Sequence, residues 1–168
     1  MQLEQVACAL ATTDIAAIYA SPRARTRESA EIIARHHQCP VQIREQLREI
    51  DFGDFEGLAY DEIARRYPAE YQLWMERPTD VQFPNGESFH TMQRRVLRVA
   101  KELAHKHAGE TIAIVTHGGV NRILLAEALG IPDANLFRIG QGYGARNLIQ
   151  HIDGYPSVEL MNHVPDPR

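Results

Sequence analysis

The sequence predicts an α/β layered fold with a largely parallel sheet, because short apolar runs alternate with stretches of helical periodicity along its 168 residues. The clearest strand is the β-branched run at 111–116, which is followed at once by a histidine, two glycines and a helix. Two predicted strands end in polar loops, at 21–27 and 117–121. Because ligands of such sheets bind beyond the carboxyl ends of the strands, we expect the two loops to form one site.

The first third of the chain alternates helix and strand before an irregular segment. Prolines mark the boundaries, since Pro22 suits the first turn of a helix and Pro40 breaks that helix. The predicted elements are a helix at 2–12, a strand at 15–19, a helix at 24–37, a short strand at 41–44 and an irregular, acidic, glycine-containing segment at 45–58.

The rest of the chain continues the alternation after a helical insert at 59–86. Gly109 and Gly130 close the long helices, and Asp153-Gly154 marks a turn between two strands. The predicted elements are helices at 60–67, 69–76 and 88–107, the strand at 111–116, a helix ending at 129, and strands at 147–152 and 158–161. Length and the absence of repeats predict a single domain over 1–168.

Composition excludes several classes of protein. A net charge of -4 argues against a nucleic-acid partner, because domains that bind nucleic acids usually carry a basic stripe. Cys8 and Cys39 form no spaced motif, and free thiols fit a cytosolic protein. Neither a membrane-spanning apolar run nor a signal-peptide pattern is present, so we expect a cytoplasmic protein without membrane association.

His117 lies in the turn between the strand at 111–116 and the next helix. The free N–H groups of a helix start favour an anion, and an imidazole beside an anion suits phosphoryl chemistry. Gly118 and Gly119 let a backbone or a ligand approach closely, which favours a functional role. The alternative is a buried histidine that is hydrogen-bonded for structural reasons.

Three arginines alternate in the loop after the first predicted strand: Arg23, Arg25 and Arg27. Arg23 and Arg27 share a helical face, whereas Arg25 points elsewhere. A guanidinium near a helix start can bind phosphate through two parallel hydrogen bonds. The alternative, which spacing alone favours, is a solvated arginine face balanced by Glu28 and Glu31.

Glu49 shares its irregular segment with Asp51, Asp54 and Glu56. Crowded carboxylates can raise one another's pKa and so make a proton donor. An acidic, solvated loop is the alternative, and the residues by themselves favour it. The histidines outside the turn at 117 lack the spacing of metal ligands, so we predict no metal.

Four segments together resemble the histidine phosphatase superfamily, the phosphoglycerate mutase-like proteins. They are, in chain order, Ser21-Pro-Arg-Ala-Arg25-Thr-Arg-Glu-Ser-Ala30, Leu47-Arg-Glu49-Ile-Asp-Phe-Gly53-Asp-Phe-Glu56-Gly57, Asn85-Gly86-Glu87-Ser88 and Val115-Thr-His117-Gly118. The ordered set covers nearly the whole chain and looks most like the small bacterial phosphatases of the α-ribazole phosphatase type. This resemblance implies a three-layer α/β/α fold of the phosphoglycerate mutase type and a phosphomonoester hydrolase that needs no cofactor.

The resemblance also implies roles for individual residues. Arg25 and His117, together with Gly118, would bind the phosphate, and His117 would stabilise the transition state. Glu49 would protonate the leaving oxygen. Asn121 and Arg122 would have rim roles only.

The 168 residues depart from the family at one point, because they contain no Arg-His-Gly. In the family, that turn ends the first central strand and carries the nucleophilic histidine, so we expect the first central strand to be missing as well. We consider a truncated or wrongly assigned start, which we favour, a degenerate relative without catalysis, and a homo-oligomer in which a second copy covers open strand edges. Without the nucleophile, turnover should fall by several orders of magnitude.

The predicted function is therefore hydrolysis of a phosphorylated small molecule through a phosphohistidine, with this chain itself inactive if the nucleophile is absent. One alternative is a module that binds a phosphorylated ligand without chemistry. Another is a phosphoglycerate mutase, whose closed site the modest loops do not suggest. Four aromatic residues of the insert region would cap the site or, as we expect, pack the insert: Tyr67, Tyr71, Trp74 and Phe83.

Overall fold

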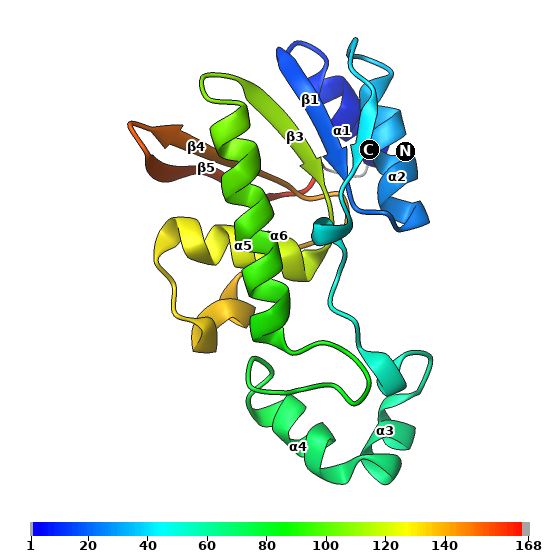
Figure 1. Cartoon of the computed structure of the whole chain (residues 1–168). Helices are drawn as coiled ribbons and strands as arrows, with labels where there is room; N and C mark the ends of the chain where they lie inside the picture. Colours follow the sequence, from blue (N-terminus) through cyan, green and yellow to red (C-terminus); the bar gives the residue numbers. More distant parts are fainter. Residues whose placement is uncertain (1, 166–168) are drawn as a thin grey trace.

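A parallel sheet of three strands forms the middle layer of the structure (Figure 1). In this computed structural model, which describes residues 2–165, the strand order is β2-β1-β3. The strands are β1 (Ile15–Ala20), β2 (Val41–Ile43) and β3 (Thr111–Val115). All pairs are parallel, as the alternation of helices and strands predicts.

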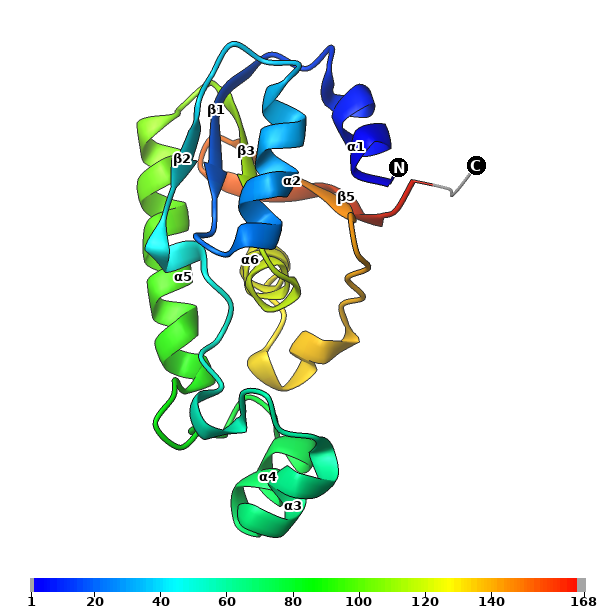
Figure 2. The same ribbon diagram turned by 90° about the vertical axis from the view of Figure 1, so that its right-hand side faces the viewer.

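Helices cover both faces of this sheet, because side chains of β1 alternate between two apolar clusters. Ile18 and Ala20 pack with α1 (Gln2–Leu10) and α2 (Ala24–Ala34) on one face. Tyr19 packs on the other face against α5 (Phe89–Lys106) and α6 (Gly118–Leu129). Figure 2 shows α1 and α2 on the side of the sheet opposite to α5. The predicted three-layer α/β/α fold is confirmed.

A hairpin forms a second, two-stranded sheet from β4 (Arg146–Ile152) and β5 (Tyr155–His163). Within residues 2–165, β3 pairs with β1 alone and β4 pairs with β5 alone. Ile114 of β3 and Ile149 of β4 nevertheless pack against the same core cluster. The two sheets therefore share one apolar core beneath α5 and α6.

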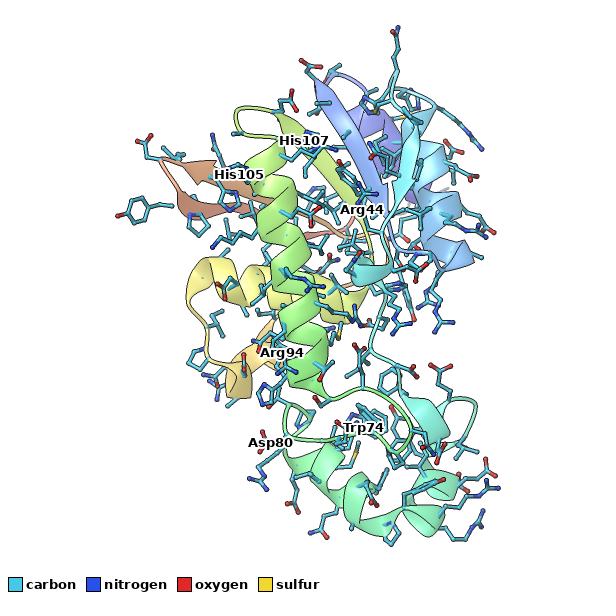
Figure 3. The ribbon with its side chains drawn as sticks, in the orientation of Figure 1. Arg44, Trp74, Asp80, Arg94, His105 and His107 are labelled. Atoms are coloured by element: carbon cyan, nitrogen blue, oxygen red, sulfur yellow. The ribbon has the colours of Figure 1, made fainter. Side chains whose placement is uncertain are left out.

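The insert region makes an apolar cluster of its own at one end of the molecule (Figure 1). It holds α3 (Tyr60–Arg66) and α4 (Pro68–Glu76). Trp74, labelled in Figure 3, contacts the rings of Phe52, Phe55 and Phe83 at 5.6–5.8 Å between centroids. Tyr67 and Tyr71 pack against the same cluster. The expectation that these aromatic residues pack the insert is confirmed.

The boundaries differ from the sequence-based expectation at a few places. α2 ends at Ala34 rather than at 37, because the N–H groups of His36 and His37 bond three residues back and turn the chain. β5 is longer than predicted, and the 3₁₀ helix η3 (Asp133–Arg138) was not predicted. The segment after β2 contains two further 3₁₀ turns, η1 (Glu45–Leu47) and η2 (Gly53–Phe55). No helix of residues 2–165 combines the length and the apolar character that crossing a membrane requires.

Candidate active site

The site begins where β1 and β3 end side by side. Ala20 is the register partner of Val115, and Ser21 N–H donates to the Val115 carbonyl at 3.1 Å, which extends the pairing by one residue. Figure 1 shows both strands pointing toward the same end of the molecule. Parallel pairing therefore brings the loop that starts at Ser21 against the turn at His117, as expected from the sequence.

His117 is buried and both of its ring nitrogens are engaged. Nδ1 lies 2.9 Å from Arg25 Nη2, and Nε2 lies 2.7 Å from Ser21 Oγ. A guanidinium can only donate, so Nδ1 is the acceptor and the proton of a neutral ring is on Nε2, which donates to Ser21. The contacts of the side chain thus fix both the orientation and the tautomer of the imidazole.

The surroundings of His117 disfavour its charged form. Burial, and after it the positive charges of Arg25, Arg23 and Arg95, together lower its pKa from the usual 6.5 to about 4. The ring is therefore neutral at pH 7. Positive charges near a neutral imidazole make an arrangement that an incoming anion stabilises.

Arg25 reaches His117 from the first turn of α2. The loop before it is held by the Thr26 hydroxyl, which lies 2.9 Å from the Ser21 carbonyl and 2.7 Å from the Arg23 carbonyl. Arg25 is an exposed residue, so its guanidinium meets both solvent and the imidazole. Arg23, by contrast, points to Glu56 at 3.7 Å. Of the three arginines, Arg25 is the one that the hydrogen bonds join to His117.

Glu49 reaches the same turn from the irregular segment. Its Oε2 accepts from Gly119 N–H at 3.0 Å and its Oε1 accepts from Ile50 N–H at 3.2 Å. A Cβ at position 119 would overlap Oε1, so the second glycine of the turn is what lets the carboxylate approach. Glu49 thus contacts Gly119, which lies two residues after His117 at the start of α6.

Gly118 begins α6, with His117 at the N-cap in extended conformation. The N-terminus of this helix presents N–H groups and the positive end of its dipole toward the site. Arg122 is tied elsewhere, because its Nε donates to the Ile139 carbonyl at 2.8 Å and its guanidinium lies over the Phe137 ring. Arg25, His117 and the start of α6 together can bind a tetrahedral oxyanion, with a carboxyl group beside it to move a proton.

Reasoning from the sequence assigned no role to three residues of this region: Ser21, Arg95 and Glu87. Ser21 is fully buried and orients His117; it begins the first of the four family-like segments, but the resemblance gives it no role. Arg95 and Glu87 form an ion pair with side chains only 14% and 10% exposed. Glu87 lies in the Asn-Gly-Glu-Ser segment, one of the four family-like segments, but the resemblance implies no role for this glutamate.

The other carboxylates near Glu49 have partners of their own. Asp54 accepts from Tyr67 Oη at 3.0 Å and from Asn85 Nδ2, and Asp51 accepts from Gly53 N–H at 3.0 Å. The segment is therefore neither a crowd of repelling carboxylates nor a freely solvated loop. Its acidic residues hold turns together.

The histidines near the C-terminal ends of α2 and α5 lie away from the site. His36 and His37 line a cavity of about 420 Å³ with Asp14, next to the start of β1 rather than its end. His107, labelled with His105 at the far end of α5 in Figure 3, bonds the buried Tyr19 hydroxyl at 2.8 Å. Among the described residues, no group of three or more His, Cys, Asp or Glu side chains could hold a metal ion.

Comparison with known proteins gives one family over almost the whole chain. The sequence profile of the histidine phosphatase superfamily (branch 1) matches residues 1–164. The bifunctional protein Rv2228c of Mycobacterium tuberculosis is 33% identical over 149 residues, which are 88% of this chain and 41% of that protein. The chain therefore spans less than half the length of this relative.

Other relatives are named as phosphatases. Phosphoserine phosphatase 1 of Hydrogenobacter thermophilus is 29% identical over 159 residues, which are 95% of this chain and 75% of that protein. An adenosylcobalamin/α-ribazole phosphatase of Salmonella typhimurium is 27% identical over 138 residues, 82% of this chain and 68% of that protein. Among solved structures, Bacillus stearothermophilus YhfR matches with a TM-score of 0.91 and 30% identity, over 98% of this chain and 82% of that chain. The predicted resemblance, fold type included, is confirmed.

We predict that Gly119→Ala separates the Glu49 carboxylate from the start of α6 without unfolding the protein. The new Cβ would overlap Glu49 Oε1, whereas alanine is intrinsically favoured over glycine in a helix by about 1 kcal/mol. In the unmodified chain, the amide resonance of residue 119 should shift as Glu49 is titrated with acid, and this response should disappear in Gly119→Ala. Gly118→Ala is the matched control, because its Cβ would lie 3.1 Å from the flexible end of Arg122 and 4.0 Å from Gln141 Cβ and would not meet Glu49. A response that persists in Gly119→Ala would contradict the assigned contact.

We further predict that neutral His117 stabilises the fold at pH 7 and ceases to do so in acid. Its pKa is about 4 when folded against 6.5 when unfolded, so the unfolded chain binds more protons in between and stability falls as pH decreases through this window. At a pH of about 4.5 the loss should be roughly 2–3 kcal/mol. Urea unfolding of the unmodified chain and of His117→Asn at both pH values measures it. The two proteins should differ in acid sensitivity by this amount, and equal sensitivity would refute the prediction.

Proposed function

The chain belongs to the histidine phosphatase superfamily, and on that premise we propose that it is a hydrolase of small-molecule phosphomonoesters. The observation that carries the proposal is the hydrogen-bonded group of Arg25, His117 and Ser21 at the joined ends of β1 and β3. Glu49, held at the start of α6, completes the set. This combination offers cationic and N–H donors for a phosphoryl group together with a carboxyl group for its leaving oxygen.

Each residue has a role that its contacts permit. Arg25 would give a pair of parallel N–H donors to two phosphoryl oxygens, as guanidinium groups do. His117, whose pKa an adjacent dianion would raise, would take up or share a proton and stabilise charge in the transition state. Glu49 in its protonated form would donate to the leaving oxygen, so that an alcohol rather than an alkoxide departs.

His117 is poorly placed to be the attacking group. Its single lone pair, on Nδ1, accepts from Arg25, and its other nitrogen donates to Ser21. In the mechanism implied by the family, a second histidine attacks phosphorus and is then released by water. Among residues 2–165, no other histidine belongs to the hydrogen-bonded group around His117. We therefore expect the turnover rate of this 168-residue chain by itself to be several orders of magnitude below that of an enzyme with the attacking histidine. We expect the chain still to bind phosphate.

The substrate class follows from the chemistry of the site and from the relatives. The names of two relatives imply phosphoserine and α-ribazole phosphate as their substrates. These two compounds share little except the phosphomonoester group. The common element is thus the phosphoryl group, which Arg25 and His117 would recognise. Contacts to the rest of the substrate would come from the surrounding loops.

A second candidate is a module that binds a phosphorylated ligand without chemistry. The observation in its favour is that His117, with both nitrogens occupied, is the only histidine that the described residues bring into the site. The two candidates share the same binding group and differ in whether an ester bond is broken.

We predict that Arg25→Ala weakens the binding of inorganic phosphate and of vanadate measured by calorimetry, with a loss in affinity of at least about tenfold. Arg27→Ala is the matched control, since Arg27 is an exposed arginine on the same helix. Equal affinity of Arg25→Ala and the unmodified chain would contradict the assignment of the phosphate site.

Hydrolysis of an aryl phosphate separates the two candidates. Slow release of phenol that disappears in Arg25→Ala and in His117→Ala supports a hydrolase. Phosphate binding without any measurable release, in a chain extended at its N-terminus as well as in this one, supports the binding module. Full enzymatic rates from the 168 residues alone would refute our expectation about the attacking histidine.

A further inference from the structure

The segment that carries Glu49 has no regular secondary structure to hold it. Residues 48–52 are neither helix nor strand, and the 3₁₀ turn η1 precedes them. Backbone carbonyls in such a segment lack ladder partners, so other groups must satisfy them when water is excluded. The question is what fixes the backbone of Glu49, because the position of its carboxylate depends on that backbone.

Arg95, on α5, donates hydrogen bonds to three backbone carbonyls in η1 and in the irregular segment that follows it. Its Nη1 donates to the carbonyls of Gln46 at 2.8 Å and Arg48 at 2.7 Å, and its Nη2 donates to the carbonyl of Glu49 at 3.1 Å. Thr116 Oγ1 donates to the remaining carbonyl, that of Leu47, at 2.6 Å. Side chains from α5 and from the end of β3 therefore hold four consecutive carbonyls.

Glu87 holds Arg95 and the other end of the same segment. Arg95 Nε donates to its Oε1 at 2.7 Å, and Arg95 Nη2 donates to its Oε2 at 2.7 Å. Glu87 Oε2 also accepts from Asp51 N–H at 3.3 Å, and Glu87 N–H donates to the Asp51 carbonyl at 2.8 Å. All five N–H donors of the guanidinium are used, three of them on the backbone of the Glu49 segment.

We propose that Arg95 and Glu87 are positioning residues for Glu49, fixing the backbone of residues 46–51 so that the carboxylate meets Gly119 N–H. The inference rests on the proposed function, because it serves the role of Glu49 as proton donor. The side-chain hydrogen bonds of the pair go to Gln46, Arg48, Glu49 and Asp51 and to each other, and none goes to Arg25 or His117. It acts through the backbone on both sides of Glu49.

The chemistry of the pair fits this role better than a general contribution to stability. Burial raises the pKa of Glu87, but the hydrogen bonds and charge of Arg95 outweigh it, so the pKa is below its usual value and the pair is ionised at neutral pH. A buried ion pair stabilises a fold no better than apolar residues of similar size. What a planar five-donor group supplies that an apolar residue cannot is a fixed geometry for three carbonyls and a carboxylate.

The test compares Arg95→Lys and Glu87→Gln with Arg94→Lys. Lysine keeps the charge at 95 but has only three donors and no planar fork, so it cannot span the same carbonyls. Glutamine keeps the shape at 87 and removes the ion pair. Arg94, labelled on α5 in Figure 3, is an exposed neighbour that donates to Thr91 Oγ1, which makes it the control for a change of arginine on this helix.

The first readout does not depend on turnover. Hydrogen exchange at Gly119 N–H should accelerate about tenfold or more in Arg95→Lys and Glu87→Gln, because its acceptor becomes mobile. The response of the Gly119 amide resonance to titration of Glu49 should weaken in parallel. Arg94→Lys should leave both unchanged. If Arg95→Lys does not fold, Glu87→Gln carries the comparison.

The second readout is specific to the proton donor. Phosphate affinity should stay within about threefold in both variants, since the Arg25 and His117 contacts are untouched. Hydrolysis of an alkyl phosphate should fall by about 10- to 100-fold more than that of a nitrophenyl phosphate, whose leaving group needs little protonation. In a Glu49→Ala background, the same changes at 95 and 87 should add nothing to this selective loss.

The results separate the two levels of inference. Unchanged protection of Gly119 in folded Arg95→Lys and Glu87→Gln would overturn the positioning role, whatever the activity. An unmodified chain that neither binds phosphate nor hydrolyses either ester would overturn the proposed function, and the exchange at Gly119 would still decide whether the pair holds Glu49. Selective loss on the alkyl ester that persists in the Glu49→Ala background would also count against the positioning role.

Discussion

The parallel pairing of β1 with β3 is the constraint on which the rest of the site depends. The register places Ala20 opposite Val115, so both strands leave the sheet at the same point. β1 continues into the loop of Ser21 and Arg25, and β3 continues into His117 and α6. A shift of one residue would turn the side chains of β1 to opposite faces, exchanging the clusters of Ile18 and Tyr19, and would separate Ser21 from His117. Core packing and the geometry of the site are thus fixed by the same hydrogen bonds.

The electrostatics of the site follow from this proximity. Burial keeps the imidazole of His117 neutral, and the charges of Arg25, which contacts the ring, and of Arg23 and Arg95 also lower its pKa. A dianionic ligand would offset the cost of concentrating positive charge beside the buried ring of His117. Arg25 Nη2 donates to Nδ1 of His117 at 2.9 Å, so the guanidinium that would bind a phosphoryl group lies directly beside the ring.

The acidic member of the site depends on a different set of contacts. Glu49 meets α6 because position 119 has no side chain, and because Arg95, Glu87 and Thr116 hold the irregular backbone around it. Residues from two regions, 87–95 and 116–119, thus converge on one short segment.

The sequence by itself determined the order of elements and the meeting of the loop at 21–27 with the turn at 117, because apolar periodicity and glycine turns are local signals. The three-layer fold and the expected roles of Arg25, Glu49 and His117 followed from the resemblance of four ordered motifs to the family. Tertiary structure alone decided which partners orient these residues. Ser21, Arg95 and Glu87 act across separations of 96, 46 and 36 residues, on His117, on Glu49 and on Asp51. A hydrogen bond over such a separation leaves no periodic or neighbouring signal in the chain. The tautomer of His117 and the backbone conformation of Glu49 therefore depend on contacts that only the tertiary structure shows.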